Sequence, residues 1–124
     1  MQPIVMQDWI TIRGAASTTV IQSQADWIFT APFQDVTFYL DVREFSPSAA
    51  VIVSYQTAPA REEAMFQNMF STAAITTTGL IGPTNVYLAN AAIPVSHWTR
   101  WKLSAGALTW DLTFRIMMAG NSLA

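Results

Sequence analysis

One alternation of apolar and polar residues recurs along the chain and limits what it can fold into. Residues 35–43 read DVTFYLDVR, and residues 108–118 read LTWDLTFRIMM. The even-numbered positions of both segments are apolar: Val36, Phe38, Leu40, Val42, Leu108, Trp110, Leu112, Phe114, Ile116 and Met118. A period of two is typical of a strand with one buried face. Both segments are therefore predicted to be half-buried β-strands.

Further strands are predicted along most of the chain, with Gly and Pro residues between them. The strongest is 50–57, with Val51, Val53 and Tyr55 on one face, and the shorter ones are 4–13, 18–22, 27–30, 74–78 and 86–90. About eight short strands separated by turns predict an all-β protein. We expect an antiparallel β-sandwich or jelly roll formed by residues 1–124 as a single domain, with a closed barrel as the alternative.

One segment has helical spacing. In residues 60–70, AREEAMFQNMF, the side chains of Met65, Phe66, Met69 and Phe70 recur at helical intervals, and two glutamates stand near the start. This pattern predicts one short helical connection between strands.

Residues 95–103 and 108–118 are predicted to pair as an antiparallel hairpin around the turn SAGA at 104–107. That register places Trp101 opposite Trp110, with both rings in the core. It also places Arg100 opposite Asp111 on the outer face. Leu103 then lies opposite Leu108, and His97 lies opposite Phe114.

The composition indicates surfaces that are covered by other chains. Hydrophobic residues make up 52% of the chain and charged residues only 11%, against about 25% in a typical globular domain. So little charge leaves apolar side chains on the surface, which favours a permanent assembly. The net charge of −2 argues against a nucleic-acid partner. No signal peptide or membrane-length apolar run is apparent, and we expect folding in a cytoplasm without disulfides, since the chain has no cysteine.

Catalytic patterns are weak. His97 is the only histidine and is expected to be packed and hydrogen-bonded in the interior. A triad of Ser96, His97 and Asp111 is disfavoured because neighbours on a strand point to opposite faces. Asp41 and Glu44 could form a carboxylate pair, but a solvated charge ladder with Arg43 is the simpler interpretation. No enzyme activity, cofactor or metal is predicted.

Three regions are predicted to contact partners. They are a candidate N-terminal arm at residues 1–9, the connection at 59–70 and the tail at 117–124. Exposed tryptophans beside arginines are a further candidate, because both residue types are enriched in interface hot spots. The residues predicted to bind a partner are Ile4, Val5, Met6, Trp9, Arg61, Met65, Phe66, Met69, Phe70 and Trp98.

Several pieces of the chain together resemble a known family. They are VSYQTAP at 53–59 running into EEAMF at 62–66, TTG at 77–79, RWKL at 100–103 and TWDLTFRI at 109–116. These motifs lie between Asp35 and Met118 and resemble small β-sandwich head decoration or cement proteins of tailed bacteriophages. The resemblance implies a noncatalytic jelly roll that binds the outside of the major capsid protein lattice as a homodimer or homotrimer. It implies a place on the virion surface after assembly in the host cytoplasm.

Two other functions stay open at this point. One is a carbohydrate-binding β-sandwich in which exposed aromatic rings line a groove, and the other is a tail or baseplate component.

Overall fold

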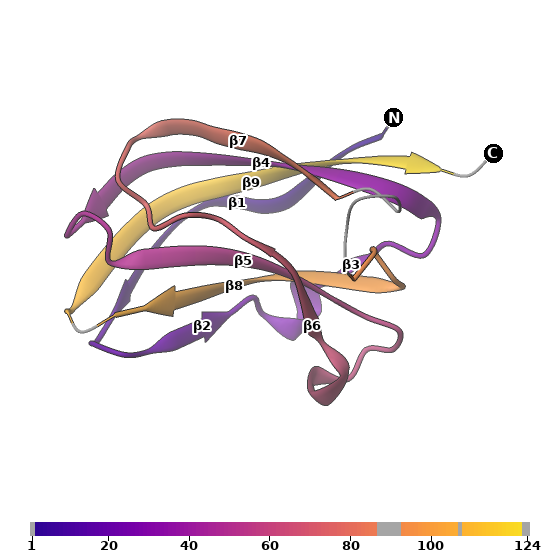
Figure 1. The fold of residues 1–124 in the computed structure, drawn as a ribbon, viewed down its shortest axis with the longest axis horizontal. Helices are drawn as coiled ribbons and strands as arrows, with labels where there is room; N and C mark the ends of the chain where they lie inside the picture. Colours follow the sequence, from indigo (N-terminus) through magenta and orange to yellow (C-terminus); the bar gives the residue numbers. More distant parts are fainter. Residues whose placement is uncertain (1, 87–92, 107, 123–124) are drawn as a thin grey trace.

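The chain forms two antiparallel β-sheets that pack face to face (Figure 1). The computed structural model describes residues 2–86, 93–106 and 108–122. The strands within this part are β1 (Gln2–Gly14), β2 (Thr19–Ile21), β3 (Ile28–Phe29), β4 (Phe33–Ser46), β5 (Val51–Ala58), β6 (Gln67–Ser71), β7 (Gly79–Val86), β8 (Trp98–Ala105) and β9 (Trp110–Ser122). Two short 3-10 turns, η1 (Gln24–Asp26) and η2 (Glu63–Met65), connect strands.

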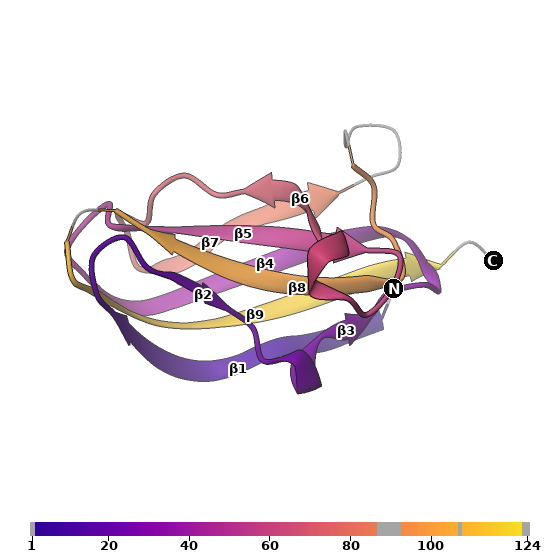
Figure 2. The ribbon, with the colours of Figure 1, turned by 90° about the horizontal axis from the view of Figure 1, so that it is seen from below.

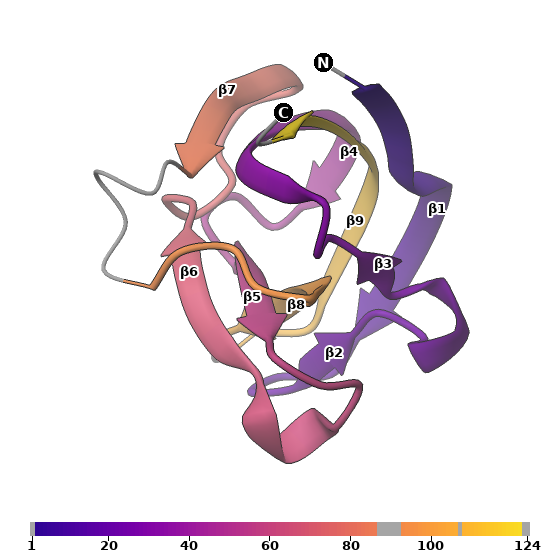
Figure 3. The same ribbon diagram turned by 90° about the vertical axis from the view of Figure 1, so that its right-hand side faces the viewer.

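The strand order is that of a jelly roll. One sheet has the order β1-β9-β4-β7, and the other has the order β2-β8-β5-β6, with β3 also paired to β8 (Figures 2 and 3). Because β2 and β3 pair with successive parts of β8, they count as one interrupted strand. Within the described residues each sheet then has four strands, and the sandwich has eight. The chain pairs first with last throughout: β1 with β9, β2 and β3 with β8, β4 with β7, and β5 with β6. Such a rolled ribbon is the jelly-roll form of the β-sandwich, and the predicted fold class is confirmed.

The core lies between the sheets and comes from the alternation seen in the sequence. The inward residues of β4 (Val36, Phe38, Leu40, Val42), of β5 (Val51, Val53, Tyr55) and of β9 (Leu112, Phe114, Ile116, Met118) are all at most 2% exposed. Burying one such side chain contributes about 1.5–3 kcal/mol. The faces predicted from the period of two are therefore confirmed for all three strands.

The predicted hairpin between residues 95–103 and 108–118 is wrong. β8 and β9 belong to opposite sheets, and the chain crosses between the sheets after Ala105. Trp101 and Phe114 meet across the core, with ring centroids 5.3 Å apart and planes at 89°. The tryptophans Trp101 and Trp110 are buried as predicted, at 2% and 3% exposure. Two strands that share one core carry the same alternation whether they are hydrogen-bonded neighbours or face each other across a sandwich.

The cross-strand pairs inferred from that hairpin are wrong with it. Arg100 lies opposite Gln56 on β5, whereas Asp111 lies opposite Arg13 on β1. Leu103 pairs with Val53 and Val20, and Leu108 is exposed. His97 is exposed rather than packed inside, and its backbone carbonyl accepts a hydrogen bond from Thr30 N–H at 2.7 Å.

Two other segments differ from expectation. Residues 2–9 are not a free arm but the first part of β1, which pairs with β9 from Gln2 opposite Gly120 to Gly14 opposite Trp110. Strand pairing satisfies the backbone there, and Met6 is buried in the core. The predicted short helical connection in residues 60–70 is present as the single 3-10 turn η2, but residues 67–71 form β6 and do not extend it. Pairing with β5 overrides the helical spacing there.

Candidate interaction site

Aromatic rings and arginines gather on the outer face of the β2-β8-β5-β6 sheet, where η1 and η2 approach one another. In Figure 1 η2 lies below this sheet, away from the other sheet, and η1 follows β2 at the sheet's lower edge. We call Trp27, Phe29, Arg61, Phe66, Trp98 and Arg100 the aromatic–arginine cluster. Strands β3 and β8 and the two 3-10 turns position these side chains.

Gln22 holds the η1 loop in place at the point where β2 ends. Its side chain is 2% exposed and bonds three backbone segments at once. Nε2 donates to the carbonyls of Met6 at 2.8 Å and Asp26 at 3.0 Å, and Oε1 accepts from Trp101 N–H at 3.3 Å. Trp27 Nε1 donates to the Gln22 carbonyl at 2.8 Å. The Gln22 side-chain amide therefore holds the η1 loop against β1 and β8, and the Gln22 backbone carbonyl holds the Trp27 ring.

Arg100 lies at the centre of the cluster, against two rings that also contact each other. Its Cζ atom is 4.0 Å from the Phe66 ring centroid and 5.0 Å from that of Trp27. The two rings meet edge to face with centroids 4.8 Å apart. A guanidinium over aromatic faces gains cation–π attraction, which is stronger when the group is desolvated. The arrangement joins η1 to η2 across the outer face of β8.

The Arg100 guanidinium is buried and, among the described residues, has no carboxylate in direct ion-pair contact. The residue is 4% exposed, and its Nε donates to Gln56 Oε1 at 3.0 Å. Its Nη1 atom is buried and has no hydrogen-bond partner. Burial lowers the pKa of Arg100 from its ordinary value, and the negative charge of Glu63 opposes that shift. Among the described residues the recorded ion pair is Arg115 with Asp41, 3.3 Å apart on the other sheet, and Arg100 forms none.

A second part of the cluster is more exposed. Phe29, which is 52% exposed, lies opposite Trp98 in the β3–β8 pairing, and their ring centroids are 5.2 Å apart. The Arg61 guanidinium carbon is 5.4 Å from the Trp98 ring centroid. Arg61 Nη2 also donates to the Gln24 carbonyl at 2.6 Å, which ties the η2 loop to η1. Aromatic rings beside arginines are the side chains that protein interfaces use most as anchors.

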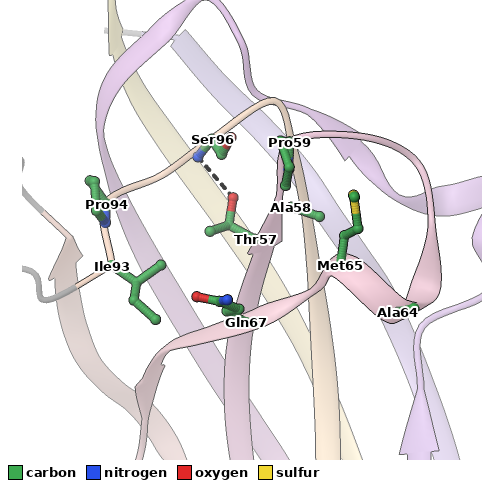
Figure 4. A pocket seen from close by; sticks show the side chains of 9 residues that line it. All are labelled: Thr57, Ala58, Pro59, Ala64, Met65, Gln67, Ile93, Pro94 and Ser96. Atoms are coloured by element: carbon green, nitrogen blue, oxygen red, sulfur yellow. Dashed lines mark hydrogen bonds between the residues drawn. The ribbon is translucent and has the colours of Figure 1, made fainter.

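A groove of about 490 Å³ opens beside the cluster (Figure 4). Its lining residues are Thr57, Ala58, Pro59, Ala64, Met65, Gln67, Ile93, Pro94 and Ser96. Thr57 Oγ1 accepts a hydrogen bond from Ser96 N–H at 2.8 Å, which closes one wall of the groove. Met65 is 46% exposed at the opposite wall. The groove is mixed in polarity, and its walls carry no ionisable side chain.

Four of the ten residues predicted to bind a partner meet at this end of the sheet. They are Arg61, Phe66 and Trp98 in the cluster and Met65 in the adjoining groove. Met69 is partly buried against the core and Phe70 is exposed, both on the edge strand β6. The structure therefore brings together part of the 59–70 region with Trp98.

The other predicted residues lie on β1, in the opposite sheet. Met6 is buried and Ile4 packs against the core, so these two side chains serve folding. Val5 is exposed. Trp9 lies on the outer face beneath two guanidiniums, with Arg43 Cζ at 4.1 Å and Arg115 Cζ at 5.0 Å from its ring centroid.

Sequence reasoning missed Arg100, Trp27 and Phe29 as members of the site. The spacing of Trp98 and Arg100, two apart on one strand, does place both on the same outward face. The burial of Arg100 could not be seen, because Trp27 and Phe66 reach it from loops that are distant in the sequence.

The part of the chain that the structure describes contains no group of three or more His, Asp or Glu side chains that could hold a metal ion. Its helical segments are single 3-10 turns, none of which could span a membrane. Asp41 is paired with Arg115, while Glu44 lies opposite Thr113.

Comparisons with known proteins bear on the fold. No family model matches the chain, and no curated protein matches it in sequence. Among solved structures it is similar to a chain in the structure of infectious bursal disease virus, Gx strain, with a TM-score of 0.50 and 9% identity. The match covers 94% of this chain but only 32% of that one, so this chain spans about a third of its length. At this identity the likeness shows a shared β-sandwich fold.

Proposed function

We propose that the chain is a noncatalytic structural protein of a virion. Its strand order is the double-sheet jelly roll, which recurs in viral capsid domains as well as in lectins and cupins. The likeness to a chain from a virus structure supports a viral capsid role over that of a lectin or a cupin. The jelly-roll strand order is the single observation that carries the proposal.

The finer proposal is a head decoration or cement protein of a tailed bacteriophage. In this role the chain binds the outside of the major capsid protein lattice, as a homodimer or homotrimer, and stabilises the head. The surface supports a partner-bound state, because several large apolar side chains are exposed: Val5, Phe29, Ile52, Met65, Phe70, Leu80 and Leu108. With only 11% charged residues, the chain has few groups to keep such a surface in water.

We propose that the aromatic–arginine cluster and the adjoining groove form the contact with the capsid. The cluster combines a buried centre at Trp27 and Arg100 with a margin formed by the exposed Phe29 and the half-buried Trp98. Pre-ordered aromatic and arginine side chains lose little entropy on binding, which is why such residues form hot spots.

A binding measurement with capsid shells tests this proposal. Purified protein is titrated onto shells of the encoding phage that were assembled without it, and onto insoluble polysaccharides. We expect saturable binding to shells that Trp98→Ala weakens about tenfold or more, as for a hot-spot residue. Leu108→Ala is the matched control, since it removes an exposed apolar side chain beyond the opposite end of β8.

The same experiment separates the rival function. The Phe29–Trp98 ring pair beside a groove would also suit sugar stacking, so carbohydrate binding has its own structural support. Binding to polysaccharide alone, lost in Trp98→Ala, would replace the cement proposal with a sugar-binding module. Binding to neither ligand would contradict both functions. Cryo-microscopy of purified particles then distinguishes a position on the head from one on the tail or baseplate.

A further inference from the structure

A cavity of about 260 Å³ lies beside Arg100 on the outer face of β8. Its lining residues are Ile21, Gln22, Gln24, Trp27, Glu63 and Arg100. The volume is below the 300–1,000 Å³ typical of pockets for drug-sized ligands, so it fits a single side chain or a small ion.

Only part of the hydrogen-bonding capacity of the guanidinium beside this cavity is satisfied among the described residues. Arg100 is 4% exposed, and the one partner recorded for its donors is Gln56 Oε1. Its Nη1 atom is buried with no partner. Glu63 supplies a negative charge in the same wall, but no direct ion pair with Arg100 is formed among the described residues. A buried guanidinium with an unbonded donor is costly, and an anion that bonds it directly offsets part of that cost. The site therefore favours a negative group that reaches the guanidinium itself.

The rings and Glu63 indicate which anion fits. Phe66 and Trp27 pack against the guanidinium, and Gln56 accepts from its Nε, so the Nη atoms are the donors left for a partner. A planar carboxylate matches a guanidinium edge with two parallel hydrogen bonds. Glu63 adds one negative charge to the wall, which disfavours a doubly charged phosphate more than a singly charged carboxylate.

We propose that this cavity is a receptor for a carboxylate supplied by another molecule. The donor is an Asp or Glu side chain, or a terminal carboxylate, of the partner protein, and this identity of the donor rests on the proposed function. Recognition of the carboxylate itself does not depend on the chain being a virion protein.

Titration of the full chain with small probes tests the receptor directly. N-acetylglutamate amide supplies a side-chain carboxylate, N-acetylalanine supplies a terminal one, and sulfate supplies a doubly charged anion. We expect saturable shifts of the Arg100 Nε–H resonance with one or both carboxylates, which distinguishes the two sources. Sulfate is expected to bind more weakly.

Variants separate this receptor from an internal ion pair. Arg100→Gln should weaken carboxylate binding about tenfold or more, the loss expected for charge-assisted hydrogen bonds. Arg43→Gln, on the other sheet, is the matched control and should leave binding unchanged. Glu63→Gln should strengthen binding because it removes a competing negative charge. Melting temperatures establish that each variant is folded, and Arg100→Lys is the second variant if Arg100→Gln fails to fold.

Two outcomes would overturn the receptor. One is the absence of any saturable shift with either carboxylate. The other is a loss of stability in Glu63→Gln equal to that in Arg100→Gln, since Glu63 would then be the natural partner of Arg100. Failure of capsid binding with intact carboxylate binding would instead reject only the proposed function.

Discussion

Single residues in this fold differ in how well their polar atoms are satisfied. Tyr55 is 0% exposed and stacks on Phe38, with ring centroids 4.0 Å apart and planes within 4°. Its hydroxyl is buried without a hydrogen-bond partner. A buried group of this kind costs about 1–3 kcal/mol, whereas the ring itself contributes to packing. The hydroxyl thus opposes the stability that the ring provides.

Tyr55→Phe is therefore expected to raise the free energy of unfolding by about 1 kcal/mol. Chemical denaturation of both proteins at neutral pH measures the difference. Tyr39→Phe is the control, because Tyr39 is only partly buried on the outer side of β4, and its change should stay within about 0.5 kcal/mol. A clear loss of stability in Tyr55→Phe would contradict the unsatisfied hydroxyl.

The same hydroxyl predicts a pH dependence. Burial raises the pKa of Tyr55 above its ordinary value of 10.0. The unfolded chain therefore releases this proton at a lower pH than the folded protein does, and stability should fall as the pH rises above about 10. Tyr55→Phe should show a shallower decline over that range. An equal fall of stability with pH in the two proteins would contradict the raised pKa of Tyr55.

At position 14 the neighbouring ring leaves no room for a side chain, which explains the glycine. A Cβ atom there would lie 2.5 Å from two carbons of the buried Trp110 ring. Gly14→Ala is expected to destabilise the protein by about 1–3 kcal/mol through overpacking. Gly106→Ala, where a Cβ meets nothing within 4 Å, should be close to neutral.

A double-mutant cycle tests that cause. Trp110→Ala alone should cost about 3–5 kcal/mol. In its background Gly14→Ala should lose most of its effect, because the clashing ring is gone. Additive effects of the two substitutions would show that the ring is not what excludes a side chain at position 14.

At the scale of elements, β2 and β3 are short and depend on a side chain between them. Both pair with β8, and Gln22 bonds to β1, to β8 and to its own loop. Gln22→Ala should lower the free energy of unfolding by about 1–3 kcal/mol, because it leaves buried backbone groups unsatisfied. Gln24→Ala, with an exposed side chain two residues on, should change it by less than about 0.5 kcal/mol. Equal effects in thermal melts would contradict the role of Gln22.

For the whole molecule, the decisive feature is that β8 and β9 lie in different sheets. NMR should detect close backbone contacts of Trp101 with Tyr55 and of Phe114 with Val42, following the strand pairings. Between Trp101 and Phe114 only ring contacts are expected. Strong backbone contacts between Trp101 and Trp110 would restore the hairpin and contradict this topology.

The sequence by itself determined the all-β class, the faces of the main strands and the burial of both core tryptophans. Those features depend on local alternation, which responds directly to one buried side per strand. The predicted strand at 74–78 was wrong, because those residues form no strand and β7 begins at Gly79. Most of the predicted strand at 86–90 lies outside the described residues. The helical spacing in residues 60–70 correctly predicted one turn, η2, but not its end, because pairing with β5 outweighed a weak local preference from Gln67 onward.

Only the tertiary structure decided which strands are neighbours and where the candidate site lies. A strand has the same apolar face whether the next strand pairs with it in one sheet or packs against it from the opposite sheet. The sequence therefore could not show whether β8 and β9 form a hairpin or lie in different sheets. The aromatic–arginine cluster likewise depends on which strands are neighbours. Trp27, Phe66 and Arg100 are far apart in the chain, and they meet because β8 pairs with β3 and β5 while two loops fold over its outer face.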